Sequence, residues 1–203
     1  MSATAEATAK SATNSPKKEP RRISWQEFQN RYIGREGRYK YEWVNGYVEK
    51  AENTMNPYQL YIQRNLTAFF RQFLNQGKVN GELMAEPDLL FFTEHHRRPD
   101  MAWLTNKQID NLAVENAIEV PAFVIEVISN KDAANALVKK MEDYRKAGVQ
   151  VVWQIYPQVK QVHVYSGKGL RQSVVCAGDE LCSAAPALPA FEMKVSDIFR
   201  LGE

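Results

Sequence analysis

Two short stretches of this sequence each carry one carboxylate at or inside an apolar run. Residues 97–104 read RRPDMAWL and residues 121–129 read PAFVIEVIS, so Asp100 precedes one apolar run and Glu126 lies inside the other. Each run is short enough to be a buried strand, and an ionised carboxylate buried without a partner is costly. If the two strands lie side by side in one sheet, the two acids can share a cation. The stretches therefore predict a divalent-metal site made by Asp100 and Glu126.

The composition is that of a globular chain with a single domain. Its 203 residues are 44% apolar, 25% charged and 11% aromatic, and the net charge is +2. That charge is too small to indicate a nucleic-acid partner by itself. No apolar run approaches the about 20 residues of a membrane span, and the beginning lacks a hydrophobic signal core, so we expect a cytoplasmic protein. Cys176 and Cys182 lack a metal or redox spacing, and we expect them to be reduced and structural.

The first 22 residues differ in character from residues 23–203. They are mostly Ala, Thr, Ser, Lys, Glu and Pro, with no aromatic side chain. This composition cannot bury a core, so we predict a disordered tail at 1–22 whose end is basic. We interpret the tail as a solvated linker in preference to a nucleic-acid arm. The ordered domain should begin at residue 23.

Capping, turn and periodicity signals predict the elements of this domain. Ser24 followed by Glu27 is a capping box for a short helix, and Asn45-Gly46 predicts the tight turn of a hairpin. Pro57 should begin a long helix that ends near Gly77. Further elements are expected as strands at 79–84, 88–92, 149–156, 159–165 and 170–176, a helix at 132–146 and a helical turn at 195–201.

Residues 94–98 form a polar segment between two predicted strands. We interpret them as a turn, and therefore expect His95 and His96 at the surface. Residues 104–121 are mixed in character and should form a loop with a short helix. Tyr144 and Trp153 are expected in the core.

Several further motifs follow one another in an order that resembles a known family. They are the hairpin YEWVNG at 41–46, KMEDYRKAGV at 140–149, VWQIYP at 152–157 and ALPAF at 187–191. With the two acidic stretches, they resemble the Uma-two family of "putative restriction endonucleases". That family belongs to the PD-(D/E)xK nuclease superfamily. The resemblance extends from about residue 23 to the end of the chain.

The resemblance implies both a fold and an activity. The fold is an α/β (α+β) fold of the restriction-endonuclease type, with a mixed central β-sheet flanked by helices. The implied site is a magnesium or manganese site made by Asp100 and Glu126, and Glu42 matches an acidic residue from the first conserved element of the superfamily. Magnesium prefers oxygen ligands and keeps several waters. It lowers the pKa of a bound water and stabilises charge on a phosphoryl oxygen.

The chain departs from the parent motif at its lysine. Ile128 stands where that lysine would follow Glu126, while Lys140 matches a lysine that the family retains on the following helix. Leu137 and Met141 mark the packed face of this helix, and Lys140 flanks them. We therefore predict that Lys140, and not Lys139, places its amine near the two acids. Two other positions also depart from the family. Many family members have an acidic residue at the position of Tyr156 and a histidine at the position of Gln59.

Two functions remain open at this point. The first is a magnesium-dependent endonuclease that hydrolyses DNA, with a homodimer as a simple way to cut both strands. The alternative is a catalytically degenerate module of the same fold that binds nucleic acid or protein. Ile128 and Tyr156 favour this alternative, whereas Asp100 and Glu126 oppose it. A substrate other than nucleic acid also stays open, because fold does not fix function.

Each candidate residue also has a purely structural interpretation. Asp100 can cap a turn, Glu42 can lie on the exposed side of its hairpin, and Lys140 can be a solvated helix residue. Gln154 can contact a metal-bound water or be a buried amide bonded to the backbone. Glu126 has the weakest structural interpretation, because an acid inside an apolar strand needs a partner.

Overall fold

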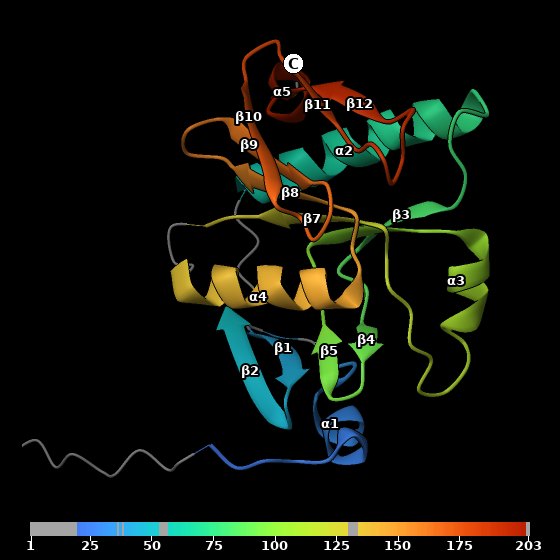
Figure 1. The fold of residues 1–203 in the computed structure, drawn as a ribbon, viewed down its shortest axis with the longest axis vertical. Coiled ribbons are helices and arrows are strands. Elements are labelled where there is room, and N and C mark those ends of the chain that lie inside the picture. Colours follow the sequence, from blue (N-terminus) through green and yellow to red (C-terminus); the bar gives the residue numbers. More distant parts are fainter. Residues whose placement is uncertain (1–19, 36, 38, 53–56, 130–133, 202–203) are drawn as a thin grey trace, which may run out of the picture.

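The computed structural model describes residues 20–35, 37, 39–52, 57–129 and 134–201. The tail expected at 1–22 lies outside the described residues except for residues 20–22. Within the described part, the chain forms a six-stranded sheet, a four-stranded sheet and a two-stranded sheet together with five helices (Figure 1). None of the described helices combines the length and the apolar character that crossing a membrane requires.

The six-stranded sheet is mixed and has the strand order β10-β9-β8-β7-β6-β3. Strands β7 and β8 are parallel, and all other neighbours are antiparallel. The parallel pair is connected by α4 (Ala134–Ala147), which makes a β-α-β unit. The strands are β3 (Glu82–Ala85), β6 (Met101–Leu104), β7 (Phe123–Val127), β8 (Val151–Tyr156), β9 (Gln161–Ser166) and β10 (Gln172–Ala177).

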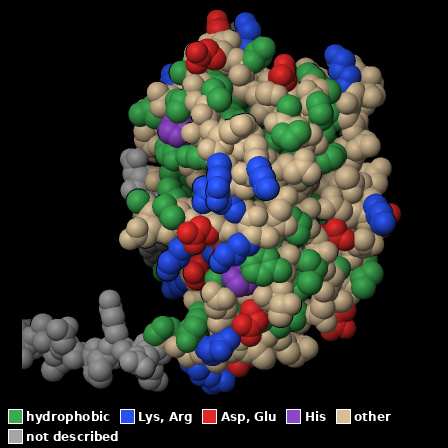
Figure 2. Space-filling view, viewed as in Figure 1, with side chains coloured by type: hydrophobic (Ala, Val, Ile, Leu, Met, Phe, Trp, Pro, Cys, Tyr) green, Lys and Arg blue, Asp and Glu red, His purple; other side chains and the backbone are tan. Residues whose placement is uncertain are grey.

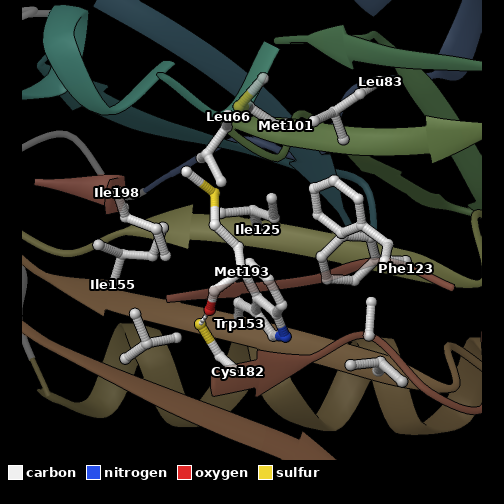
Figure 3. Close-up of a cluster of buried hydrophobic side chains, with 14 of the residues drawn as sticks. Leu66, Leu83, Met101, Phe123, Ile125, Trp153, Ile155, Cys182, Met193 and Ile198 are labelled. Carbon is white, nitrogen blue, oxygen red and sulfur yellow. Dashed lines mark hydrogen bonds between the residues drawn. The ribbon is translucent and has the colours of Figure 1, made fainter. Parts of the chain in front are cut away.

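Alternation along β7 divides its side chains between the two faces of this sheet. Phe123 and Ile125 join the core cluster on the side of α2 (Pro57–Asn75), where Leu66 and Trp153 also lie (Figure 3). Val124 joins a second cluster with Met141 and Tyr144 of α4. Since successive side chains of a strand point to opposite faces, Glu126 lies on the α4 side. The fold thus places an acid under a helix that carries lysines.

The four-stranded sheet has the order β2-β1-β5-β4 and lies across α4 from the large sheet (Figure 1). Its hairpin turns at Asn45 and Gly46, whose φ angles of 52° and 82° fit the predicted tight turn. Helix α1 (Trp25–Tyr32) begins at the predicted cap Ser24, whose side chain accepts a hydrogen bond from the Glu27 N–H. The strands are β1 (Tyr39–Val44), β2 (Tyr47–Glu52), β4 (Leu89–Phe92) and β5 (His95–Arg97).

The remaining elements complete the core on the α2 side. Cys182 and Phe191 are fully buried there, and Cys176 and Cys182 are both free thiols, as expected. These elements are β11 (Leu181–Ser183), β12 (Glu192–Lys194) and α5 (Val195–Ile198), whereas Ile109 of α3 (Asn106–Asn111) packs against the cluster on the α4 side.

The interpretation of residues 94–98 as a polar surface turn is wrong. His95, His96 and Arg97 form β5, and all three are buried. The His96 ring packs against the Trp25 and Phe28 rings, with centroids 5.6 and 5.1 Å apart. The His95 ring stacks on Phe92 at 4.0 Å. The two imidazoles pack as aromatic rings, and this segment of polar residues therefore forms a buried strand. The strand predicted at 79–84 also begins later, at Glu82.

Candidate active site

Glu126 lies in β7 and Asp100 immediately precedes β6, and these two strands are neighbours in one sheet, as the sequence predicted. The register pairs Met101 of β6 with Ile125 of β7, and one further step places Asp100 opposite Glu126. The backbone N–H of Val127 donates to Asp100 Oδ2 at 2.8 Å, which ties the Asp100 side chain to the end of β7. The two carboxylates therefore belong to one cluster beside α4.

Asp100 has a cation partner that sequence reasoning missed. The Lys40 amine of β1 donates to Asp100 Oδ1 at 2.9 Å, and the Lys40 side chain is only 9% exposed. Burial by itself would raise the pKa of Asp100. The charges of Lys40 and Lys140 and the two hydrogen bonds outweigh it, so the pKa of Asp100 lies below its usual value. Asp100 is consequently held as a carboxylate.

Glu126 contacts two side chains of α4. The Lys140 amine lies 2.9 and 3.1 Å from the two Glu126 carboxylate oxygens, and the Tyr144 hydroxyl donates to Oε1. Burial raises the pKa of Glu126, the Lys140 charge lowers it, and the nearby Asp100 charge raises it again. The net pKa of Glu126 is raised, chiefly by burial, with the Asp100 charge adding to the effect.

Lys140 bridges two acids of the cluster. Its amine lies 3.3 Å from Glu42 Oε1 in addition to the two contacts with Glu126. Burial lowers the pKa of Lys140, but Glu126 and Glu42 outweigh this effect and hold the pKa well above its usual value. The position of this amine agrees with the helix-face prediction. Lys139, in contrast, is exposed.

Glu42 is buried and not on the exposed side of its hairpin. One of its oxygens accepts from the Arg97 guanidinium at 2.7 Å, and the other accepts from the backbone N–H of Arg98 at 2.9 Å. Burial would raise its pKa, but Lys140, Arg97 and Lys40 together lower the pKa of Glu42 to about 2. Glu42 thereby connects β1 both to β5 and, through Lys140, to α4.

Arg97 is the centre of an ion-pair network that sequence reasoning also missed. Its side chain is 2% exposed and contacts three carboxylates. Nη1 lies 2.7 Å from both Glu42 and Glu49, and Nε donates to Asp143 of α4 at 3.0 Å. These contacts hold the pKa of Arg97 above its usual value against the opposing effect of burial. The network fixes the small sheet to α4 and so positions Glu42 and Lys40.

Two other residues singled out in the sequence lie beside this cluster. Gln154 pairs with Glu126 across the parallel strands β7 and β8, and its side chain accepts from the Tyr156 hydroxyl at 2.9 Å. The Gln154 side-chain oxygen is thus bonded to another side chain. Ile128 is buried, and its backbone N–H donates to Ile155 at 2.8 Å. The position of the missing lysine is therefore occupied by a core residue.

Asp100 and Glu126 provide the oxygen ligands that a hard divalent cation prefers. The network joins five carboxylates to three cations, a formal excess of two negative charges. The carboxylates are those of Glu42, Glu49, Asp100, Glu126 and Asp143, and the cations are Lys40, Arg97 and Lys140. Within the described residues, no group of three or more His, Cys, Asp or Glu could hold a metal ion unaided. Magnesium commonly rests on one or two carboxylates and water, so Asp100 and Glu126 could hold it.

Comparison with known proteins returns a family and a fold. A family model described as "Putative restriction endonuclease" (Uma-two) matches residues 25–196. The crystal structure of a "putative nuclease" from Anabaena variabilis ATCC 29413 is similar over 87% of this chain and 97% of that chain, with 19% identity and a TM-score of 0.70. At this identity the likeness concerns the fold, and it confirms the restriction-endonuclease-like architecture. No match was found among curated proteins.

Proposed function

Because this chain belongs to the Uma-two family of restriction-endonuclease-like proteins, we propose that it is a divalent-metal-dependent endonuclease that hydrolyses phosphodiester bonds in DNA. The single observation that carries the proposal is the cluster at the end of β7. There Asp100 and Glu126 lie across one strand pair, and the Lys140 amine is 2.9 Å from Glu126. Two acids and a lysine are the groups that metal-assisted phosphodiester hydrolysis uses.

Each residue of the cluster has a separate role in the proposed reaction. Asp100 and Glu126 would hold magnesium or manganese, which supplies Lewis-acid chemistry and a water of lowered pKa. The Val127 N–H fixes the Asp100 carboxylate, and the Tyr144 hydroxyl fixes that of Glu126. Hydrolysis adds a water oxygen to phosphorus, breaks the bond to the leaving oxygen and ends with a proton on that oxygen.

Lys140 is proposed as the lysine of the reaction. Its amine is held by Glu126 and Glu42 and keeps its charge, because its pKa is well above the usual value. A charged amine next to the metal ligands can donate hydrogen bonds to the phosphoryl oxygens as negative charge develops on them. Glu42 acts by holding the amine, since its other oxygen is bonded to Arg97.

Exposed cations on α4 support a nucleic-acid substrate. Arg145 and Lys146 are exposed on α4, the helix that carries Lys140. Figure 2 shows Lys and Arg side chains gathered over the middle of this face of the molecule. Cations contribute sequence-independent affinity for the phosphate backbone. Binding should therefore weaken as the salt concentration rises.

One feature favours a second candidate, a degenerate module that binds without cutting. Asp100 and Glu126 each already have a lysine amine at hydrogen-bond distance, from Lys40 and Lys140 respectively. If these ion pairs never open, the acids cannot bind a metal, and the fold would serve as a nucleic-acid or protein binding module. The two candidates differ in whether the protein cleaves DNA when a divalent cation is supplied.

A cleavage assay separates the candidates. Wild type is incubated with supercoiled plasmid, linear duplex and single-stranded DNA in magnesium, manganese or a chelator. We expect cleavage that needs the metal, is lost in Asp100→Asn and falls at least about a hundredfold in Lys140→Ala, as for loss of a transition-state donor. Lys139→Ala is the matched control and should cut like wild type. No cleavage of any DNA despite metal binding would favour the binding module.

A further inference from the structure

Strand β10 forms one edge of the six-stranded sheet, and its outer side is unpaired among the described residues. It pairs only with β9, from Gln172 opposite Ser166 to Ala177 opposite Gln161. Figure 1 shows β10 next to β9, and the strand order places β10 at the border of the sheet. The first four residues of β10 are all exposed although their side chains alternate between faces. This part of the edge is therefore open to solvent on both faces.

The hydrogen-bonding pattern identifies which backbone groups point outward. The N–H of Ala177 donates to Glu180 Oε2, so Ala177 does not direct its N–H toward β9. Because antiparallel strands alternate between residues that bond inward and residues that do not, Ser173 and Val175 also direct their N–H and C=O groups outward. Val174 lies between them and bonds toward β9. The open edge thus offers two donors and two acceptors to another strand.

The edge lacks the features that normally prevent strand pairing. Natural edge strands are protected by charged residues, proline or bulges. Residues 172–177 read QSVVCA, with no charge and no proline. Val174 is 60% exposed and Val175 52%, which is unusual for valines in a strand of this sheet. The other edge strand of the same sheet, β3, begins with the exposed Glu82.

The charges that flank β10 favour an antiparallel copy of the same strand. Exposed cations, Lys168 and Arg171, precede the strand, and exposed anions, Asp179 and Glu180, follow it. In an antiparallel pair of identical strands, the cationic end of each lies beside the anionic end of the other. A parallel copy would bring like charges together at both ends. The second copy is therefore the partner that this edge fits best.

We infer that this protein forms a two-fold homodimer in which β10 of one protomer pairs with β10 of its partner, with Val174 at the axis. Ser173 then exchanges hydrogen bonds with the partner's Val175, and the two Val174 side chains face each other. The two six-stranded sheets join into one continuous sheet across the axis. The inference rests on the edge alone and is independent of the proposed nuclease activity.

The oligomeric state of the full chain gives the first test. Light scattering after size exclusion and sedimentation over a range of concentrations should give a dimer mass for wild type. Val174→Lys places two like charges across the axis and should weaken dimerisation roughly tenfold or more. Val114→Lys is the matched control, because Val114 is 61% exposed and lies outside the sheet. It should dimerise like wild type.

Cross-linking tests the register. Residues that face each other in a non-hydrogen-bonded pair have Cα atoms about 4.5 Å apart, within the range of a disulfide. Val174→Cys should therefore form a disulfide-linked dimer under mild oxidation. Val175→Cys should not, because the two copies of residue 175 are offset and lie beyond the about 7 Å limit. Wild type oxidised in the same way is the control, because it shows whether Cys176 or Cys182 forms a disulfide between protomers.

Three results would overturn the inference. They are a wild type that stays monomeric up to its solubility limit, a dimer that Val174→Lys leaves intact, and cross-linking through Val175→Cys in place of Val174→Cys. Circular dichroism of each variant confirms that the fold is intact before its mass is interpreted.

Discussion

Replacing Arg97 with methionine should destabilise the fold more than any single surface change. Arg97→Met keeps the apolar stem of the side chain but removes the charge that contacts Glu42, Glu49 and Asp143. Removing one partner of a buried ion pair costs about 3–5 kcal/mol, because the opposite charge stays buried without compensation. Glu49 is 42% exposed and can return to water, so most of the cost comes from Glu42 and Asp143.

The pKa of Glu42 gives a second route to the magnitude. Its cation partners lower this pKa from 4.5 to about 2, against the effect of burial. At ~1.4 kcal/mol per pKa unit, the shift corresponds to about 3 kcal/mol, shared among Lys140, Arg97 and Lys40. The first route therefore gives a loss of a few kcal/mol for Arg97→Met, and the Arg97 share of the Glu42 shift is one part of it. That is a large part of the about 5–15 kcal/mol by which a domain is normally stable.

Urea denaturation at pH 7, followed by tryptophan fluorescence, measures this loss. Arg98→Met is the matched control, since Arg98 is the adjacent residue, is 25% exposed and pairs with Glu86 at 2.9 Å. It should cost less than Arg97→Met, because Arg98 pairs with one carboxylate whereas Arg97 contacts three. Combining Arg97→Met with Glu42→Gln should recover part of the loss, because the uncompensated charge is then removed. Equal losses for Arg97→Met and Arg98→Met would refute the assignment of Arg97 as the centre of the network.

Two further predictions concern magnesium and pH. Magnesium at ten times its dissociation constant should stabilise wild type by about 1.4 kcal/mol and raise the melting temperature by roughly 4 °C; an equal rise in Asp100→Ala would contradict the site. Because the folded pKa of Glu42, about 2, lies below its unfolded value near 4.5, its stabilising contribution is complete above about pH 5 and is lost as pH falls toward 2. The difference in unfolding free energy between wild type and Glu42→Gln should therefore shrink over that range, and a difference that stays constant with pH would count against the ion pairs of Glu42.

The sequence allowed the strand pair and the lysine position to be predicted because local patterns report them. An ionised acid inside the apolar run of β7 needs a partner, because burying it alone is costly. The apolar stripe of α4 determines which lysine faces the sheet. The restriction-endonuclease-like fold was implied by the family resemblance that several motifs in order carry. In each case the signal lies within one element or in the spacing of consecutive ones.

The ion-pair network could not be predicted in the same way. Arg97 contacts residues 46, 48 and 55 positions away in the chain, and Lys40 lies 60 positions from Asp100. Such contacts depend on the pairing of β1 with β5, which no local pattern specifies. One clue was present: Lys40 and Glu42 alternate with apolar or aromatic residues in β1, as expected for a strand with one distinct face. The Lys40 and Glu42 side chains on that face point into the charged cluster and not to solvent. They can be buried there because Arg97 and Lys140 neutralise the Glu42 charge and Asp100 neutralises the Lys40 charge.

The central claim is that Asp100 and Glu126 share a divalent cation, and a crystal soaked in manganese tests it most directly. The anomalous difference map should contain a peak bonded to carboxylate oxygens of both residues, with the Lys40 amine moved away from Asp100 or the Lys140 amine moved away from Glu126. The same soak of Asp100→Asn should lose the peak. A wild-type map with no peak between these carboxylates, and with both lysine ion pairs unchanged, would contradict the claim.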